Sequence, residues 1–128
     1  MKHLLDTHTF LWFVSDSPKL SEKARNLIID PTNDFYVSLA SLWEISIKVS
    51  IGKLELNGDY RSVIDDVTSN DFILLPINFA HTVCLSSLPF HHRDPFDRML
   101  IAQAITERLP VVGKDKVFDR YEGIERIW

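Results

Sequence analysis

Residues 4–14 read LLDTHTFLWFV and carry the clearest signal of the fold. A short apolar run ends at Asp6, and the apolar and aromatic segment Thr7–Val14 that follows is typical of a helix. A run this short, bounded by a polar residue, indicates a central strand with both faces covered. The same alternation of short apolar runs and longer helical patterns continues along the chain. It predicts an α/β domain with a central, mainly parallel sheet.

The remaining segments follow the same pattern. No repeat, linker or low-complexity tract interrupts them, so residues 1–128 are expected to form a single domain. Ser21 suits a helix N-cap and Gly52 suits a helix stop. Strands are expected at 35–37, 72–77 and 110–112, with a last edge strand at 124–128. Helices are expected at 21–29, 38–51, 59–69, 79–88 and 97–109.

The composition is that of an ordinary globular domain. The 128 residues carry a formal net charge of −4, whereas dedicated nucleic-acid binders usually show a basic surface. This excess of acid argues against a pure nucleic-acid-binding module, but less against an enzyme whose acidic site holds metal ions. The single cysteine, Cys84, excludes an intrachain disulfide and fits a reducing, cytoplasmic setting. No apolar run approaches the roughly 18 residues that cross a bilayer, so no membrane association is expected.

Four acidic residues are expected to meet at one edge of the sheet. Asp6 ends the first strand, and Asp115 lies shortly after the strand at 110–112. In open parallel sheets, functional groups gather outside the carboxyl ends of the strands. Asp97, in the first turn of its helix, and Glu44, about one and a half turns into its own, can point toward the same edge.

Four carboxylates at one place suit hydrolysis of a phosphodiester. Hard divalent cations such as Mg²⁺ and Mn²⁺ prefer oxygen ligands. One or two such ions supply a nucleophilic water and stabilise the charge of the transition state. Without metal the carboxylates repel one another, which raises one or more of their pKa values. Such a cluster is therefore expected to be kept for metal binding and not for stability.

Each acid also has a purely structural interpretation. Asp6 could cap the helix that begins at Thr7. Glu44 could close a capping box with Ser41. Asp97 could simply favour the dipole of its helix, and Asp115 could be an ordinary loop acid. Only the joint position of the four at strand-to-helix junctions favours a site.

The loop at 89–96 adds further polar candidates. Asp94, one turn before Asp97, could cap the next helix with Pro95 in its first turn. The His91–His92 pair with Asp94 resembles a metal-binding run, but adjacent residues rarely bind one ion, so a solvated or substrate-facing loop is expected. His8 is expected to pack. Basic residues could contact phosphate, although an exposed charge is the alternative for each of Lys48, Lys53, Arg93, Arg98, Lys114, Lys116 and Arg120.

Several blocks of the sequence resemble the PIN-domain family, and most of all its VapC-like toxins. They are LLDTH at 4–8, SLWEISIK at 41–48 with GKL at 52–54, HRDPFDRMLIAQA at 92–104 and VVGKD at 111–115. The resemblance covers essentially the whole chain. It implies a three-layer α/β/α sandwich and a Mg²⁺- or Mn²⁺-dependent endoribonuclease that acts on RNA. It also implies a homodimer and a cognate antitoxin that docks over the site.

The family's four acids fall on Asp6, Glu44, Asp97 and Asp115. Asp97 is preferred to Asp94 because its spacing to the block AQA at 102–104 matches the family. Substrate contacts are expected from Arg93, Arg98, Lys48 and Lys114. One departure is Gly113, where the family often has Thr or Ser, so a hydroxyl beside the last acid is missing.

Two other functions compete with this one. The first is a protein-interaction module that has kept the fold but weakened its catalysis, which Gly113 and the acidic composition favour. The second is a phosphatase of the haloacid-dehalogenase type with Asp6 as nucleophile. That class requires a second Asp two residues later, where this chain has His8.

Overall fold

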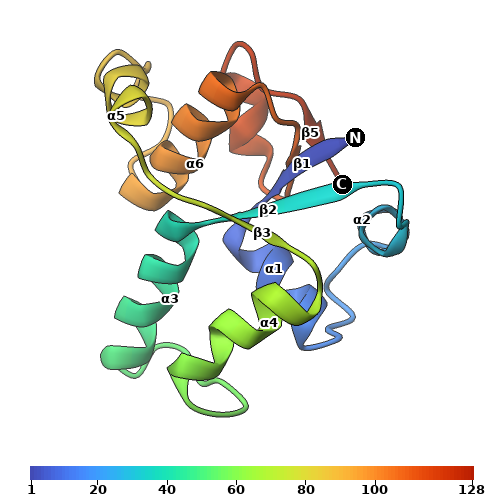
Figure 1. The fold of residues 1–128 in the computed structure, drawn as a ribbon. Coiled ribbons are helices and arrows are strands. Elements are labelled where there is room, and N and C mark those ends of the chain that lie inside the picture. The colour runs from blue at the N-terminus through green and yellow to red at the C-terminus, as the bar shows by residue number, and fades with distance from the viewer.

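The computed structural model describes residues 1–128 and places a parallel sheet at the centre of the chain (Figure 1). The strand order is β3-β2-β1-β4-β5, and every neighbouring pair is parallel. The central strand β1 therefore lies between β2 and β4, and β5 forms one edge, as expected for the tail. The strands are β1 (Lys2–Leu5), β2 (Asp34–Ser38), β3 (Ile73–Leu75), β4 (Val111–Val112) and β5 (Arg126–Ile127).

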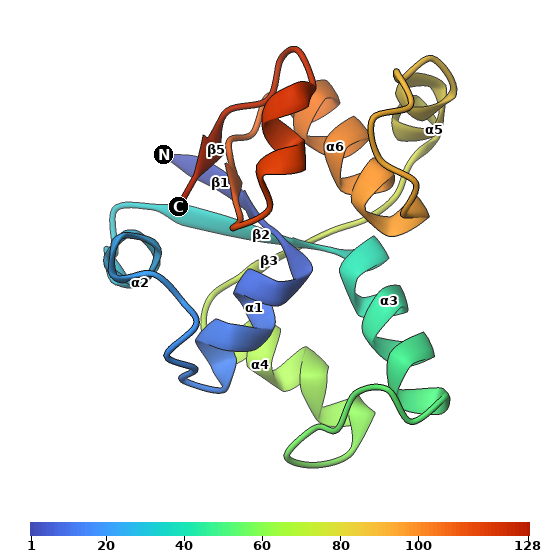
Figure 2. The same ribbon diagram turned by 180° about the vertical axis from the view of Figure 1, so that it is seen from behind.

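Helices cover both faces of this sheet, which confirms the expected α/β/α sandwich. One face carries α1 (Thr7–Val14), α2 (Glu22–Ile29) and α4 (Val63–Ser69), and the other carries α5 (Phe79–Ser86) and α6 (Pro95–Glu107) (Figure 1). The helix α3 (Leu39–Ser50) leaves the end of β2 and passes beside the first turn of α6 (Figure 2). Two short 3-10 helices, η1 (Tyr60–Ser62) and η2 (Lys116–Arg120), complete the chain.

Successive side chains along the strands point to opposite faces of the sheet and pack into two separate apolar cores. Leu5 and Val112 pack with Phe10 on the α1 face, whereas Leu4 and Val111 pack with the α6 face. All five of these side chains are fully buried. Burying one such side chain contributes about 1.5–3 kcal/mol, so the two cores fix β1 and β4 in the sheet. The carboxyl ends of these two strands are thereby held side by side.

Most element boundaries differ from those expected by one or two residues, and three segments differ in a way that has a local cause or changes the element. The helix expected at 59–69 is divided into η1 and α4, and the strand expected at 72–77 is reduced to β3. Pro76 ends that strand because it has no N–H to donate to the ladder. The expectation that the last long helix begins at Asp97 is wrong, because α6 begins at Pro95. Asp94 caps it by accepting hydrogen bonds from the backbone N–H of Phe96 (2.8 Å) and of Asp97 (3.2 Å).

Other local signals are confirmed. The side chain of Ser21 accepts a hydrogen bond from the backbone N–H of Ala24 and caps α2. Gly52 follows α3 with a φ of +75°, a conformation that side chains disfavour. None of the helices combines the length and the apolar character needed to cross a membrane.

Candidate metal centre

The carboxyl edge of the sheet receives all four predicted acids. Asp6 directly follows β1, and Asp115 follows the neighbouring strand β4. Glu44 comes from α3, which begins where β2 ends, and Asp97 lies in the first turn of α6. Parallel strands thus bring together residues that are up to 109 positions apart in the sequence.

Asp6 is a buried carboxylate without a structural partner. Its residue is only 5% exposed and occupies the N-cap position of α1, yet its side chain accepts no capping hydrogen bond. The pKa of Asp6 is raised from its usual value of 3.8 to about 7, mainly by burial. The Thr7 backbone opposes this rise, and the charges of Glu44, Asp115 and Asp94 contribute to it. The capping interpretation therefore does not explain this residue.

Glu44 is equally buried and only half satisfied. Its Oε2 accepts a hydrogen bond from Nζ of Lys48 at 2.8 Å, whereas its Oε1 is buried with no partner. The capping-box interpretation is wrong, because α3 is capped by Ser38, and the Ser41 hydroxyl instead accepts a hydrogen bond from Thr7. A buried carboxylate oxygen left unpaired is costly, so Glu44 presents a free ligand atom.

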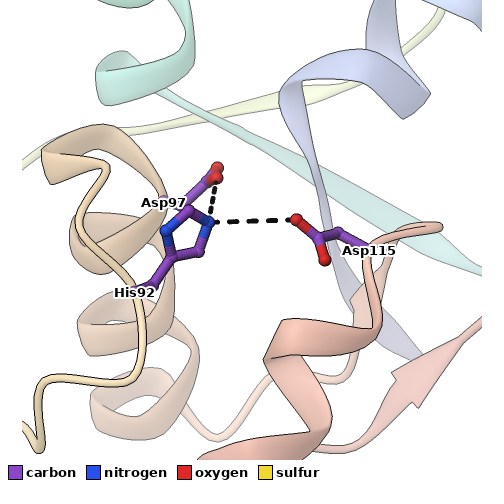
Figure 3. A group of neighbouring side chains, drawn as sticks. All are labelled: His92, Asp97 and Asp115. Carbon is purple, nitrogen blue, oxygen red and sulfur yellow. Dashed lines mark ion pairs between the residues drawn. The ribbon is translucent and has the colours of Figure 1, made fainter.

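Asp97 and Asp115 meet a residue that the acid pattern did not place in the site, His92. Figure 3 shows the His92 ring between the two carboxylates, with Nε2 2.8 Å from Oδ2 of Asp97 and 3.8 Å from Oδ2 of Asp115. One possible ligand atom from each of the three lies within 4.8 Å of the others. Glu44 and Asp6 stand outside this group. The run His91–His92 with Asp94 is the signal in the sequence that points to this loop, although a metal-binding role is not expected of it.

The charges of the acids affect one another's pKa values. The pKa of Asp97 is raised to about 7, mainly by burial. The charges of Asp6, Asp94 and Glu44 contribute to this rise, and His92 opposes it. Asp6 and Asp97 thus compete for ionisation with each other and with their neighbours. Such mutual repulsion between buried carboxylates disfavours their ionisation unless a positive charge offsets it.

Two of the acids also perform local structural tasks. Both oxygen contacts of Asp94 go through Oδ1 to the backbone of α6, so its role as a cap is confirmed. Asp115 uses Oδ1 to accept a hydrogen bond from the Val117 backbone N–H at 3.0 Å and thereby caps η2, while its Oδ2 faces His92. Asp115 can therefore cap and bind a ligand at the same time.

Gly113 leaves room for the carboxylate of Asp6. A Cβ at position 113 would lie 3.1 Å from Cβ of Asp6 and 3.3 Å from its Oδ2, closer than ordinary van der Waals contact. The Thr or Ser that the resemblance leads one to expect here would press on Asp6. The absence of a side chain at Gly113 therefore allows the carboxylate of Asp6 to lie where it does.

The basic residues expected to contact phosphate differ in their exposure and in their partners. Arg93 and Lys114 are exposed near the cluster, and Lys48 is paired with Glu44. Arg98 is buried, donates from Nη1 to the Pro89 carbonyl at 3.0 Å and lies 4.3 Å over the ring of Phe90. Arg98 therefore contacts and stabilises the loop that precedes α6. The remaining basic candidates are exposed: Lys53, Lys116 and Arg120.

A cavity of about 630 Å³ adjoins the cluster between α1, α3 and α4. It touches the site through Thr7, next to Asp6, and through Lys48, the partner of Glu44. His8 is exposed in its wall beside Trp12. The apolar part of the lining consists of Leu11, Trp12, Val14, Ile45, Leu54, Leu56 and Val63.

The family model for the PIN domain matches residues 3–124. The chain belongs to the PIN domain family. Comparison with curated protein sequences gave no match. The match to the PIN model spans the four acids and the loop with His92, so the cluster described above lies wholly within the PIN domain.

Solved structures with the same fold come from several bacteria. VapBC2 from Rickettsia felis, bound to a DNA fragment from its promoter, has a TM-score of 0.72 at 16% identity, covering 99% of this chain and 98% of that chain. DNA-bound VapBC from Salmonella typhimurium has a TM-score of 0.72 at 19% identity, covering 99% and 97%. VapBC-5 from Mycobacterium tuberculosis, a member of a toxin-antitoxin family, has a TM-score of 0.63 at 20% identity, covering 98% and 97%. These likenesses show that this PIN domain has the fold found in VapBC structures.

Proposed function

We propose that this PIN domain protein is a Mg²⁺- or Mn²⁺-dependent endoribonuclease that hydrolyses RNA phosphodiester bonds as the toxin of a toxin–antitoxin pair in the cytoplasm. The observation that carries the proposal is the buried, unpartnered Oε1 of Glu44 beside Asp6 and Asp97, whose pKa values are both raised to about 7. Carboxylates held together at a cost to stability suit a divalent cation, and PIN domains are generally nucleases.

The donor set fits Mg²⁺ or Mn²⁺ because it consists of carboxylate oxygens. Asp6 and Asp97 would be the core ligands, and Glu44 and Asp115 would complete the set or orient the attacking water. When bound, the ion supplies charge stabilisation and lowers the pKa of a water. The hydrogen bond that Lys48 donates to Glu44 raises the pKa of Lys48.

Positive side chains around the cluster would bind the RNA backbone. Arg93 and Lys114 are exposed and free to reach phosphate, and we keep both as substrate contacts. Lys48 and Arg98 remain proposed contacts as well, although each is already engaged by a protein group. Phosphate contacts position RNA without reading its sequence, so these residues would contribute affinity that falls with salt.

Cleavage of RNA by the purified protein tests this function. The wild-type chain in Mg²⁺ or Mn²⁺ is expected to cut single-stranded RNA internally and to lose this activity in EDTA. Asp6→Asn and Asp97→Asn are expected to be inactive, whereas Asp65→Asn, an exposed acid on α4, serves as a matched control with wild-type activity. Equal cleavage by wild type and Asp6→Asn would exclude the assignment of the site.

The partner protein is proposed from the VapBC structures and from the cavity beside the site. An antitoxin segment with an apolar face would fill this cavity and cover the acids from there. Leu54→Glu, at the cavity wall, is expected to abolish neutralisation by the antitoxin while RNA cleavage stays at the wild-type rate. A Leu54→Glu variant that is still neutralised would place the antitoxin elsewhere.

A homodimer is proposed from an exposed apolar stripe on α3. Leu39, Trp43 and Ile47 lie four residues apart on one side of the helix, and Ile51 follows at its C-cap. The four side chains are between 37% and 58% exposed. Exposed apolar side chains in such a row typically mark an interface. Light scattering should give a dimer for wild type and a monomer for Ile47→Lys; a monomeric wild type would exclude the dimer.

The alternative of a catalytically weakened interaction module rests on Gly113, which lacks the hydroxyl that the family often places there. Absence of measurable Mn²⁺ binding would favour it. The phosphatase alternative has lost its basis, since the chain is a PIN domain and His8 occupies the position of the second Asp that a phosphatase requires.

A further inference from the structure

Gln103 is a fully buried amide on α6, in the block AQA at 102–104. Its Nε2 donates a hydrogen bond to the Pro76 carbonyl at 3.2 Å. A carbonyl can only accept, so this contact fixes which end of the amide points to Pro76. The other end, Oε1, therefore faces the hydroxyl of Ser38, at a distance of 2.5 Å.

The hydroxyl of Ser38 connects Gln103 to α3. Ser38 is fully buried and is the N-cap of α3. Its single hydrogen is donated to Oε1 of Gln103, because that oxygen can only accept. The lone pairs of the hydroxyl oxygen are then free to accept a hydrogen bond from the Ala40 backbone N–H at 3.0 Å. Gln103 therefore orients the hydroxyl that caps α3.

The Pro76 carbonyl belongs to the segment between β3 and α5, and this segment is itself attached to α6. The backbone N–H of Asn78 donates a hydrogen bond to Nδ1 of the fully buried His81 at 3.1 Å. Nε2 of the same ring lies 3.0 Å from Oε1 of Glu107, the last residue of α6. The carbonyl that orients the Gln103 amide is thus held in place from a second position on α6.

The bond between Ser38 and Gln103 is the only hydrogen bond that joins α6 to α3 or to its N-cap. A second contact between the two helices is the edge-on packing of Trp43 on Phe96, whose ring centroids lie 5.0 Å apart. Aromatic packing tolerates small shifts of the rings, whereas a hydrogen bond weakens steeply when its distance or angle changes. The buried hydrogen bond therefore fixes the position of α3 against α6.

Each of the two helices carries one acid of the cluster at the same distance from this bond. Glu44 lies six residues after Ser38, and Asp97 lies six residues before Gln103. Six residues span about 9 Å along a helix. The two acids are close enough for the charge of Glu44 to contribute to the raised pKa of Asp97. A shift of α3 at its N-cap would therefore move the unpaired Oε1 of Glu44 relative to Asp97.

We propose that Gln103 is a positioning residue that, through Ser38, holds Glu44 and Asp97 at the separation at which both can bind one divalent cation. This inference rests on the proposed metal-dependent function and adds to it a residue that contacts neither metal nor RNA. Mg²⁺ demands near-ideal octahedral geometry, so a small displacement of one carboxylate is enough to weaken its binding. Removing the support of a metal ligand typically lowers metal affinity by about tenfold to a hundredfold.

Calorimetric titration with Mn²⁺ tests this role without RNA cleavage. Gln103→Met keeps the size of the side chain but makes neither hydrogen bond, and it is expected to bind Mn²⁺ about tenfold more weakly. Ser38→Ala, which removes only the hydroxyl, should weaken binding as well. The matched control is Val67→Ala, a buried residue of α4, which should lower the melting temperature by leaving a cavity and yet bind Mn²⁺ like wild type. Affinity within about twofold of wild type in Gln103→Met or in Ser38→Ala would overturn the proposal.

Double variants separate the positioning of Glu44 from a general loosening of the site. If Gln103 acts through Glu44, Gln103→Met should change Mn²⁺ affinity by less than about twofold in a Glu44→Gln background. In an Asp115→Asn background the same change should still cost about tenfold. Equal effects in the two backgrounds would show that the amide does not act through Glu44. Circular dichroism selects a temperature at which every variant is folded, and Ser38→Ala replaces Gln103→Met in both backgrounds if the latter does not fold.

The two proposals fail in different ways. If wild type neither cleaves RNA nor binds Mn²⁺, the ribonuclease function is wrong, and the role of Gln103 is wrong with it. If wild type does both and Gln103→Met binds Mn²⁺ equally well, only the role of Gln103 is wrong.

Discussion

Nζ of Lys48 lies 2.8 Å from Oε2 of Glu44, and the other oxygen of the same carboxylate is buried without any partner. The pair sits one helical turn apart on α3, with Glu44 almost wholly buried and Lys48 at its solvent side. Lys48 thus compensates one oxygen of a buried carboxylate, and the other oxygen stays unpaired at a cost to stability.

Lys48→Met should destabilise the metal-free protein by about 1–3 kcal/mol, because a buried charge loses its hydrogen-bond donor. The loss should largely disappear in the double variant Lys48→Met, Glu44→Gln, which removes the charge as well. Urea unfolding in EDTA measures both, with the exposed Lys53→Met as the matched control. Equal destabilisation with and without the Glu44 change would mean that Lys48 acts through packing alone.

The metal-free protein should become more stable when Asp6 is replaced by Asn. The pKa of Asp6 is about 7 in the fold, against a usual value of 3.8 that applies to the unfolded chain. The stability that protonated Asp6 contributes is therefore fully present below about pH 4 and is lost as the pH rises to 7. Since a change of one in pKa corresponds to about 1.4 kcal/mol, ionised Asp6 costs the fold on the order of 4 kcal/mol.

Melting curves in EDTA between pH 4 and pH 8 test whether ionisation of Asp6 destabilises the fold. Wild type should lose stability across that window, Asp6→Asn should lose less, and at pH 8 the variant should melt higher. Mg²⁺ should raise the melting temperature of wild type but not of Asp6→Asn. A variant that melts lower than wild type at pH 8 without metal would show that Asp6 stabilises the fold.

Gly113→Ala should weaken metal binding by about tenfold, because the added Cβ meets Asp6 at 3.1 Å and displaces its carboxylate. The backbone at Gly113 does not have the positive φ that disfavours side chains, so crowding is the only expected effect. Isothermal titration with Mn²⁺ measures the change. Comparison with Gly113→Thr separates crowding from any benefit of a hydroxyl, and unchanged affinity in Gly113→Ala would rule out the coupling.

Arg98→Met should loosen the loop before α6 while keeping most of the buried stem. The loss of the bond to Pro89 and of the contact with Phe90 should lower stability by about 1–3 kcal/mol. Hydrogen exchange at the His91 amide, which donates to Tyr121, should become faster. Tyr121→Phe, which removes the acceptor directly, gives the reference; unaltered exchange in Arg98→Met would show that the loop is held without Arg98.

Local and periodic features of the fold could be predicted from the sequence. The strand before Asp6 and the helix after it are signalled by neighbouring residues, and α1 has the expected bounds. The start of α6 was misplaced although the Asp94–Pro95 signal was visible, because Asp97 also fits a first turn. The split of the expected 59–69 helix was also missed; there Tyr60 of η1 donates a hydrogen bond from its hydroxyl to the distant Leu42 carbonyl at 2.8 Å, a contact that the segment itself does not reveal.

The acidic site could be predicted because parallel strands bring their carboxyl ends to one edge. Neither His92 nor the role of Gly113 could be predicted in the same way. His92 enters the site through a backbone hydrogen bond and through anchors at Arg98 and Tyr121, which are distant in sequence from one another. The contact of position 113 with Asp6 joins residues 107 positions apart, and only the pairing of β1 with β4 creates it.

Direct titration with Mn²⁺ tests most directly whether Asp6, Glu44, Asp97 and Asp115 form one metal centre. Calorimetry on the purified protein should show saturable binding to wild type and to the control Asp65→Asn, with affinity lower by at least about tenfold in Asp6→Asn and in Asp97→Asn. Failure of wild type to bind Mn²⁺, or equal affinity in wild type and Asp6→Asn, would contradict the account.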